Sequence, residues 1–200
     1  MIKNPLQQRL EAHKIILASG SPRRKKFFEE LHIPFEIQLK PVEEIYPAHL
    51  KGAEISDYLA QLKATPFRET LATNEILVTS DTVVWCQGES LAKASNKEEA
   101  TQMLRKLSGT WHQVITSVCF TTPSQQRVEH CVTEVTFKTL SEVEIAYYIQ
   151  ECEPFDKAGA YGIQEWIGSI AIEEIKGSYN NVVGLPTHLV YKTLMAMAIA

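Results

Sequence analysis

Hydrophobic residues in this chain alternate between short runs, typical of buried strands, and spacings of three or four residues, typical of amphipathic helices. The runs predict strands at residues 15–18, 34–40, 76–86, 114–120, 128–137 and 170–175. The helical spacings predict helices at residues 22–31, 55–70, 96–108, 141–149 and from 187 onward. This alternation, without internal repeats or low-complexity linkers, predicts a single α/β domain over residues 1–200, with residues 1–13 as a polar, amphipathic lead-in.

Sequence signals mark several of the expected element ends. Residues 95–98 (Ser-Asn-Lys-Glu) and 141–144 (Ser-Glu-Val-Glu) match the capping-box pattern that opens a helix. Pro66 must kink or end the first part of helix 55–70, because proline lacks the backbone N–H that an interior turn needs. A turn at residues 87–89 predicts that the chain reverses direction after strand 76–86.

Composition limits the classes of protein that this chain can represent. With 200 residues, 44% of them hydrophobic, the chain can bury a sizeable core. A net charge of −4 argues against a general nucleic-acid binder, so any phosphate site must be local. We expect no membrane association, because no apolar stretch approaches transmembrane length and the N-terminus lacks the apolar centre of a signal peptide. The four cysteines form no C-x-x-C pair and are expected to be reduced core thiols of a cytoplasmic protein.

The first chemical signal is residues 17–24 (Leu-Ala-Ser-Gly-Ser-Pro-Arg-Arg). Ser21 is the expected N-cap and Pro22 the first helical residue. Arg23 and Arg24 follow at the positive end of the helix dipole, where cations are unfavourable unless an anion is bound. Small residues and guanidinium groups at a helix N-terminus therefore predict a phosphate cradle, although the segment taken alone fits a solvated basic face equally well.

The second signal is Asp81, a single carboxylate within the apolar strand 76–86. A buried ionised carboxylate needs a cation, a metal or hydrogen-bond donors nearby. Lys93 follows the turn at Gly88, so a hairpin would return it towards Asp81. The alternatives are that Asp81 only pairs with a neighbouring lysine or with backbone amides, and that Lys93 is an ordinary exposed lysine.

Two glycine-containing segments provide weaker signals. Residues 156–164 (Asp-Lys-Ala-Gly-Ala-Tyr-Gly-Ile-Gln) suit a tight loop beside a ligand, and Gln164 offers a donor and an acceptor to a base edge. These glycines serve a simple turn equally well. Residues 180–186 are interpreted first as the entry to the last helix and second as a nucleotide-side loop.

Together these segments resemble the Maf family of nucleoside triphosphate pyrophosphatases over residues 17–194. The motifs that carry the resemblance occur in the family's order at residues 17–24, 80–84, 93, 104–109 with His112, 156–164 and 183–186. The resemblance implies hydrolysis of a nucleoside triphosphate between its α and β phosphates, with a divalent cation (Mg²⁺ or Mn²⁺). It also implies an α/β fold similar to inosine triphosphatases, in which a mixed twisted sheet flanked by helices forms two lobes with a central cleft.

The resemblance assigns roles to individual residues. Triphosphate binding falls to Ser19, Ser21, Arg23 and Arg24. Asp81 matches the proton acceptor and a metal-side carboxylate, Glu44 matches a second carboxylate near the metal, and Lys63 and Lys93 match phosphate-facing lysines. This set is chemically coherent, because cations stabilise a pyrophosphate leaving group while a carboxylate activates water. His112 is expected to be structural.

Substrate preference is predicted from Arg23, Thr82 and Gln164, which match the branch of the family that prefers dTTP and UTP. Ala92 and Ala94 replace the family's usual residues on either side of Lys93, and Glu165 and Trp166 are expected to add bulk and charge beside the base pocket. The alternatives are a pyrophosphatase that prefers 7-methyl-GTP and a nucleotide-binding regulator of septum formation and cell division. The sequence lacks a P-loop and specifies no protein partner, although a homodimer is compatible with it.

Overall fold

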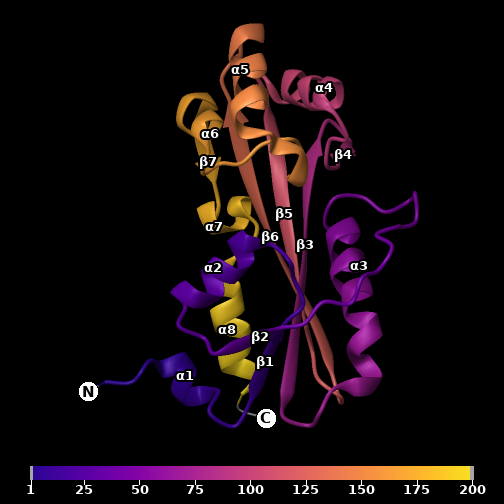
Figure 1. The fold of residues 1–200 in the computed structure, drawn as a ribbon, viewed down its shortest axis with the longest axis vertical. Coiled ribbons are helices and arrows are strands. Elements are labelled where there is room, and N and C mark those ends of the chain that lie inside the picture. The colour runs from indigo at the N-terminus through magenta and orange to yellow at the C-terminus, as the bar shows by residue number, and fades with distance from the viewer. Residues whose placement is uncertain (1, 199–200) are drawn as a thin grey trace.

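The computed structural model describes residues 2–198 and is organised around one long, twisted, mixed sheet (Figure 1). Its seven strands are β1 (Lys14–Leu17), β2 (Phe35–Ile37), β3 (Glu75–Cys86), β4 (Glu89–Leu91), β5 (Trp111–Thr121), β6 (Gln126–Phe137) and β7 (Ile172–Lys176). The strand order is β2-β1-β3-β5-β6-β7, with β4 paired to the far end of β3. β1 runs parallel to β2 and β3, and the other pairs are antiparallel. The mixed sheet expected from the sequence is therefore confirmed.

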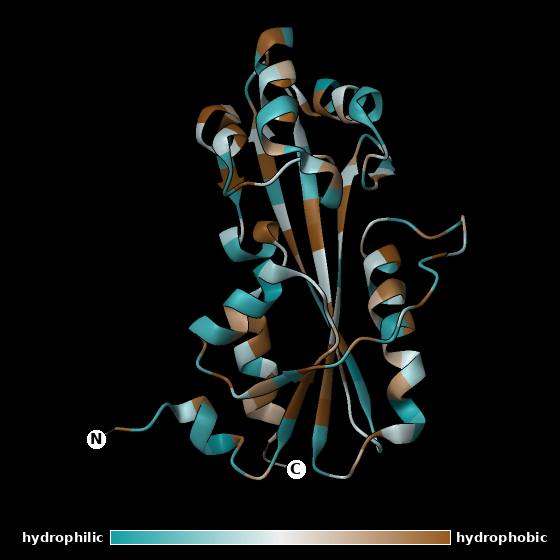
Figure 2. Ribbon diagram, in the orientation of Figure 1, coloured by the Kyte–Doolittle hydropathy of each residue, from teal (hydrophilic) through white to brown (hydrophobic). Residues whose placement is uncertain are grey.

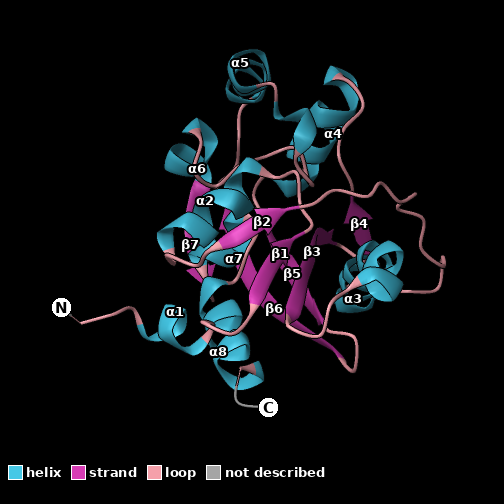
Figure 3. Ribbon diagram, turned by 60° about the horizontal axis from the view of Figure 1, so that its bottom comes forward, coloured by secondary structure: helices cyan, strands magenta, loops and turns pink. Residues whose placement is uncertain are grey.

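Helices cover both faces of this sheet. They are α1 (Pro5–Arg9), α2 (Pro22–Glu30), α3 (Ala53–Ala64), α4 (Lys97–Leu107), α5 (Glu142–Cys152), α6 (Trp166–Ala171), α7 (Tyr179–Val183) and α8 (Thr187–Met197), with 3₁₀ segments at Thr65–Thr70 and Pro154–Asp156. Figure 3 shows the sheet between α3 on one side and α2 and α8 on the other. Figure 2 shows hydrophobic segments on the long strands and hydrophilic strips on the helices around them.

Two hydrophobic cores lie on one face of the sheet, at opposite ends of β3 and β5. The first packs α1, α2 and α8 against residues such as Val78 and Val118. The second packs α4, α5 and α6 against residues such as Val84 and Val114. Between them the same face carries the hydroxyls of Ser80, Thr82 and Thr116. Polar residues in the middle of otherwise apolar strands thus divide the molecule into two lobes.

Most element positions predicted from the sequence are confirmed, and a few boundaries are wrong. Strand 34–40 is reduced to Phe35–Ile37, because only these residues pair with β1 at the edge of the sheet. Residues 170 and 171 end helix α6, so the expected strand 170–175 begins only at Ile172. Helix 55–70 ends at Ala64, and Pro66 lies in the 3₁₀ segment that follows, as the missing N–H requires.

The two capping boxes differ in outcome. The box at Ser141 is confirmed, with both reciprocal hydrogen bonds to Glu144. The box expected at Ser95 is displaced by one residue, because Asn96 is the N-cap of α4 and its side chain accepts from the Glu99 N–H at 2.9 Å. The Glu99 carboxylate in turn accepts from the Ser95 N–H. The Asn side chain thus competes successfully with Ser for the cap.

All four cysteines are free thiols, as expected. Cys86 and Cys119 are buried in the cores, whereas Cys131 and Cys152 are only half-buried. Burial raises the pKa of each thiol, so the reactive thiolate is disfavoured at neutral pH.

Candidate active site

A cleft of about 880 Å³ opens between the lobes where β1 ends. The last contact between β1 and β3 is the hydrogen bond from the Ala18 N–H to the Val78 carbonyl, at 2.9 Å. β4 joins the same strand only from Val84 onward. Between these points, the described strands leave that edge of β3 uncovered, so Ser80, Asp81 and Thr82 line the cleft.

The N-terminus of α2 forms one wall of this cleft. Ser21 is the N-cap, its hydroxyl accepts from the Arg24 N–H, and Pro22 occupies the first helical position. The Ser19 hydroxyl accepts from the Ser21 N–H at 3.3 Å and so tightens the turn before the helix. The predicted strand–turn–helix arrangement is confirmed, and Ser19, Ser21, Arg23 and Arg24 all line the cleft. Their contact with a triphosphate stays a prediction.

Arg24 is hydrogen-bonded extensively to the protein itself. Its Nε donates to the Gly184 carbonyl at 2.9 Å, Nη1 to the Ser80 carbonyl at 2.8 Å, and Nη2 to the Thr82 hydroxyl at 3.1 Å. Nη1 also lies 3.5 Å from the Ser19 hydroxyl, so four of the five guanidinium donors are used. Burial lowers the pKa of Arg24, and the nearby charge of Asp81 partly offsets this. Arg24 therefore joins α2, β3 and the segment after α7, which leaves it little capacity to bind a ligand.

Arg23 has a different environment from its neighbour. Its Nη1 donates to the Asp156 carboxylate at 2.8 Å, so this ion pair bridges from α2 to the other lobe. The Arg23 side chain is 27% exposed and the Asp156 side chain 58% exposed. Because both groups line the cleft and reach solvent, Arg23 can exchange Asp156 for an anionic ligand.

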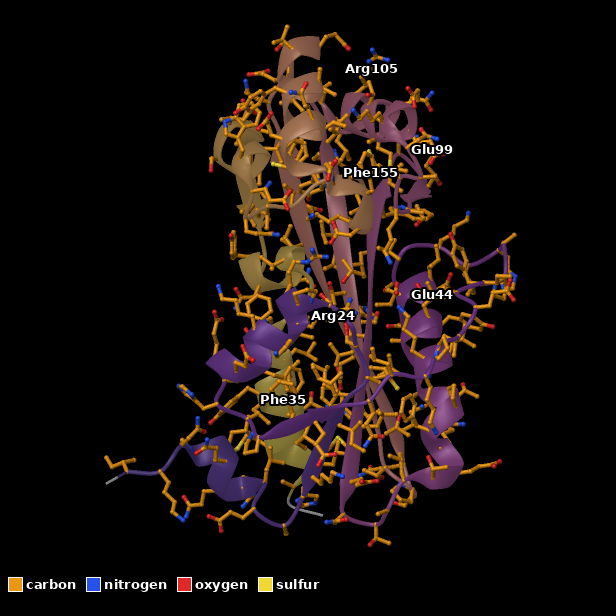
Figure 4. The ribbon with its side chains drawn as sticks, viewed as in Figure 1. Arg24, Phe35, Glu44, Glu99, Arg105 and Phe155 are labelled. Carbon is orange, nitrogen blue, oxygen red and sulfur yellow. The ribbon has the colours of Figure 1, made fainter. Side chains whose placement is uncertain are left out.

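The opposite wall of the cleft holds two carboxylates that share one lysine. Lys63 on α3 lies with its Nζ 2.6 Å from Asp81 Oδ1 and 3.2 Å from Glu44 Oε1. The Asp81 side chain is only 10% exposed, so its negative charge needs a neighbouring cation. Lys63 provides that cation. Figure 4 shows Glu44 and Arg24 at similar height on opposite sides of the long strands.

Lys93 lines the same cleft but forms none of the ion pairs found within residues 2–198. The hairpin of β3 and β4 does return the chain towards the cleft, and the backbone at Lys93 forms an isolated bridge with Ala158. The Gly159 N–H adds hydrogen bonds to the Leu91 and Ala92 carbonyls. This attachment of segment 156–162 to the end of β4 could not be read from the sequence, because it depends on residues more than 60 positions apart.

The residues expected to select the base line the cleft on the side of the lobe that contains α4, α5 and α6, called the upper lobe from its place in Figure 1. Thr82 and Gln164 both line it, and the Thr82 hydroxyl also lies 3.0 Å from the Thr116 hydroxyl. Neither Glu165 nor Trp166 lines the cleft, so the expected bulk of Trp166 beside the base pocket is wrong. The Glu165 carboxylate, in contrast, lies beside Gln164 over Gly162, as expected. Trp166 instead packs against Tyr147 on α5, with ring centroids 4.9 Å apart. Helix α6 begins at Trp166, and Glu165 precedes it as the N-cap residue.

His112 is fully buried within the upper core. Its Nε2 lies 2.7 Å from the Tyr161 hydroxyl, and its ring packs edge-on against Phe137. Burial lowers the pKa of His112 to about 4, so the ring is neutral at physiological pH. Tyr161 lines the cleft and His112 lies behind it, which agrees with the expected structural role.

The carboxylates of Asp81 and Glu44 fit a divalent metal. Within residues 2–198, no three His, Cys, Asp or Glu side chains gather into a complete metal site. Mg²⁺, however, binds nucleotide sites through one or two carboxylates together with phosphate oxygens. Two carboxylates that already converge on one cation provide the protein part of such a site.

Comparison with known protein families gives a match that includes the residues of the cleft. The model of the family described as Maf-like protein matches residues 14–197. The chain belongs to the Maf family. Curated Maf relatives include proteins named "dTTP/UTP pyrophosphatase" from Flavobacterium johnsoniae, 56% identical over 96% of this chain and 99% of the relative, and from Christiangramia forsetii, 54% identical over 96% and 98%.

A solved structure supports the Maf fold independently of close sequence identity. The Staphylococcus aureus Ham1 protein superposes with a TM-score of 0.53 over 92% of this chain and 99% of its own, at 15% identity. At that identity the match concerns the fold alone. No helix within residues 2–198 has the length and apolar composition needed to cross a bilayer.

Proposed function

We propose that this Maf protein hydrolyses the α–β phosphoanhydride of dTTP and UTP, releasing the nucleoside monophosphate and pyrophosphate. The observation that carries the proposal is the pairing of Asp81 and Glu44 through Lys63, opposite the cationic N-terminus of α2 in one cleft. The relatives that carry the name dTTP/UTP pyrophosphatase align with almost the whole chain, which supports the substrate class.

Residues on the two walls of the cleft have different roles in the reaction. Ser19, Ser21 and Arg23 hold the phosphates, and Lys93 adds a cation from the other side. Lys63 fixes Asp81 through Oδ1, so that the other carboxylate oxygen can accept a proton from water. The water oxygen bonds to the α-phosphorus, the bond from that phosphorus to the bridging oxygen breaks, and its electron pair leaves with pyrophosphate.

A divalent cation, Mg²⁺ or Mn²⁺, completes the proposed site. Glu44 and Asp81 are the residues that would hold it. When bound, it supplies positive charge that stabilises the developing charge on the phosphates. The chain's own cations contribute in the same direction, since a pyrophosphate leaving group needs electrostatic stabilisation more than protonation.

Base selection is proposed to rest on Thr82 and Gln164 at the upper-lobe end of the cleft. The exposed amide of Gln164 offers both a donor and an acceptor, which suits the imide edge of uracil or thymine. We also propose that residues 1–200 act as one unit in the cytoplasm, without a nucleic-acid partner. The free thiols and the net charge of −4 support this part of the proposal.

A panel of nucleoside triphosphates tests the proposal. Pyrophosphate release is measured with UTP, dTTP, CTP, ATP, GTP and 7-methyl-GTP, each with Mg²⁺ or Mn²⁺. UTP and dTTP should exceed the others in kcat/KM by at least about tenfold, because a site built on hydrogen bonds leaves its own polar groups unpaired with a wrong base. A profile dominated by 7-methyl-GTP would overturn the substrate assignment, and nucleotide binding without turnover would support the regulator instead.

The variant Asp81→Asn tests the catalytic step. We expect the fold and nucleotide binding to persist while kcat falls by about 10²–10⁴-fold, the usual loss for a general base. Circular dichroism and calorimetry check folding and binding, and Glu43→Gln removes a carboxylate one residue from Glu44 as a control. Turnover near that of the unchanged protein would remove Asp81 from the mechanism.

A further inference from the structure

A row of alternating charges runs from the proposed triphosphate site to helix α5. Arg23 Nη1 lies 2.8 Å from Asp156 Oδ2, and Asp156 Oδ1 lies 2.6 Å from Lys157 Nζ. Lys157 Nζ also lies 2.9 Å from Glu165 Oε1, and the second Glu165 oxygen accepts from the Tyr148 hydroxyl. The row therefore links α2 in one lobe to α5 in the other.

Asp156 and Lys157 form the middle of this row. Partial burial would raise the pKa of Asp156, but hydrogen bonds from Lys157 and Arg23 outweigh it and hold the pKa below its ordinary value. The Lys157 side chain is only 10% exposed and lies between two carboxylates. Because both residues line the cleft, their orientation sets the charge that a bound triphosphate meets.

Glu165 links this row to the turn that carries Gln164. Its backbone N–H donates to the Gly162 carbonyl at 3.0 Å, and the Gly162 N–H donates to the Tyr148 oxygen at 3.0 Å. Burial, with the Glu165 carboxylate adding to it, raises the pKa of Tyr148, so the phenol stays protonated and donates to Glu165. Backbone and side-chain contacts of Glu165 and Tyr148 thus close the turn from both ends.

The absence of a side chain at Gly162 explains why the side chains of Gln164 and Glu165 lie together. A Cβ at Gly162 would lie 2.9 Å from the carboxyl carbon of Glu165 and 3.0 Å from Gln164 Nε2. The Gln164 amide and the Glu165 carboxylate therefore pack over a backbone that lacks a side chain. Loss of the Glu165 carboxylate would open space directly beside the Gln164 amide.

We propose that Glu165 is a positioning residue for base selection, which sets the Gln164 amide and, through Lys157 and Asp156, aligns Arg23 before the triphosphate displaces Asp156. The inference rests on the proposed function, in which Gln164 meets the base and Arg23 the phosphates. Glu165 lies outside the cleft lining and acts through its neighbours.

The test compares kcat/KM for UTP and CTP in Glu165→Ala, Glu165→Gln and Tyr148→Phe. In Glu165→Ala the UTP:CTP ratio should fall by at least about threefold, with KM for UTP rising more than kcat falls, because one misplaced hydrogen bond forfeits part of an approximately tenfold preference. Glu165→Gln, which can still accept from Tyr148 or Lys157, should recover part of the ratio. Tyr148→Phe removes only one hydroxyl and should shift the ratio in the same direction as Glu165→Ala.

Glu151→Ala is the matched control, because Glu151 is an exposed glutamate of α5 whose carboxylate, among the residues described, accepts a hydrogen bond only from its neighbour Gln150. It should keep the ratio. A purely structural Glu165 would lower the melting temperature and the rate on all substrates equally. An unchanged ratio in both folded Glu165 variants, together with a flattened ratio in Gln164→Ala, would overturn the positioning role and leave the proposed function intact. An unchanged ratio in Gln164→Ala as well would overturn both this inference and the base-reading part of that function.

Discussion

At the scale of single residues, the adjacent arginines of α2 make different contacts. Arg24 donates to three acceptors on β3 and the segment after α7, whereas Arg23 makes one partly exposed ion pair across the cleft. The structure therefore predicts different consequences for the two substitutions, which the helix dipole alone would not.

Arg23→Ala should raise KM for UTP and change stability by no more than about 1 kcal/mol, as is usual for an exposed ion pair. Arg24→Ala should lower the free energy of unfolding by about 1–3 kcal/mol, because buried carbonyls lose their donor. Urea unfolding and steady-state kinetics measure both. Equal stability losses for the two variants would contradict the division of roles.

His112 gives a pH dependence of stability whose sign follows from its burial. Its folded pKa of about 4 lies below the ordinary value of 6.5, so between these values the unfolded chain binds more protons. Stability is therefore full above pH 6.5 and falls as the pH is lowered towards 4, by at most about 1.4 kcal/mol per pH unit.

Urea unfolding at several pH values should show that the free energy of unfolding changes less with pH in His112→Gln than in the unchanged protein. His49→Gln, at an exposed position, should keep the pH dependence of the unchanged protein. If His112→Gln has the same pH dependence of stability as the unchanged protein, other groups must cause the acid sensitivity.

At the scale of elements, helix α6 depends on a close approach between its own backbone and the turn before it. A Cβ at Gly168 would lie 1.8 Å from the Ile163 carbonyl oxygen, a distance that no side chain can occupy. This helix was missed in the sequence, because six residues show no helical period and Gly168 argues against a helix.

Gly168→Ala should lower the free energy of unfolding by about 1–3 kcal/mol, as overpacking does, and weaken base selection by moving Gln164. Gly20→Ala is the stability control, since its Cβ would meet only a Leu39 methyl group at 3.8 Å. Denaturation curves and the UTP:CTP ratio provide the measurements. A fully stable Gly168→Ala protein would show that α6 can move away without cost.

At the scale of the whole molecule, the two lobes share their longest strands. β3 and β5 contribute residues to both cores, so neither core can lose its strands without disturbing the other. We therefore expect one cooperative unfolding transition.

The tryptophans permit a direct test, because Trp85, Trp111 and Trp166 all lie at the end of the strands that carries β4 and α6. Tryptophan fluorescence should report this lobe, and far-UV circular dichroism should report both. The two melting curves should coincide. A fluorescence transition that precedes the loss of secondary structure would show that the lobes unfold separately.

The sequence by itself predicted the order of the longer strands and helices, the Maf membership and the residues that line the cleft, but not α1, β4, α6 or α7. Hydrophobic period and capping residues are local, so β3, α2 and α5 could be located from neighbouring positions alone. The same locality explains the errors: the displaced N-cap at Asn96 and the missed helix α6 depend on contacts that propensity does not encode.

Only the tertiary structure decided which side chains meet. It placed Lys63, 18 positions before Asp81, against that carboxylate, although Lys93 was expected there. It directed Arg24 into the protein, Arg23 towards Asp156, and Glu165 towards Lys157. These pairings depend on how α2, α3 and segment 156–165 are brought together around one cleft beside β3. Charge and hydrogen bonding act over a few ångströms in space, whereas the pattern of a sequence records only distance along the chain.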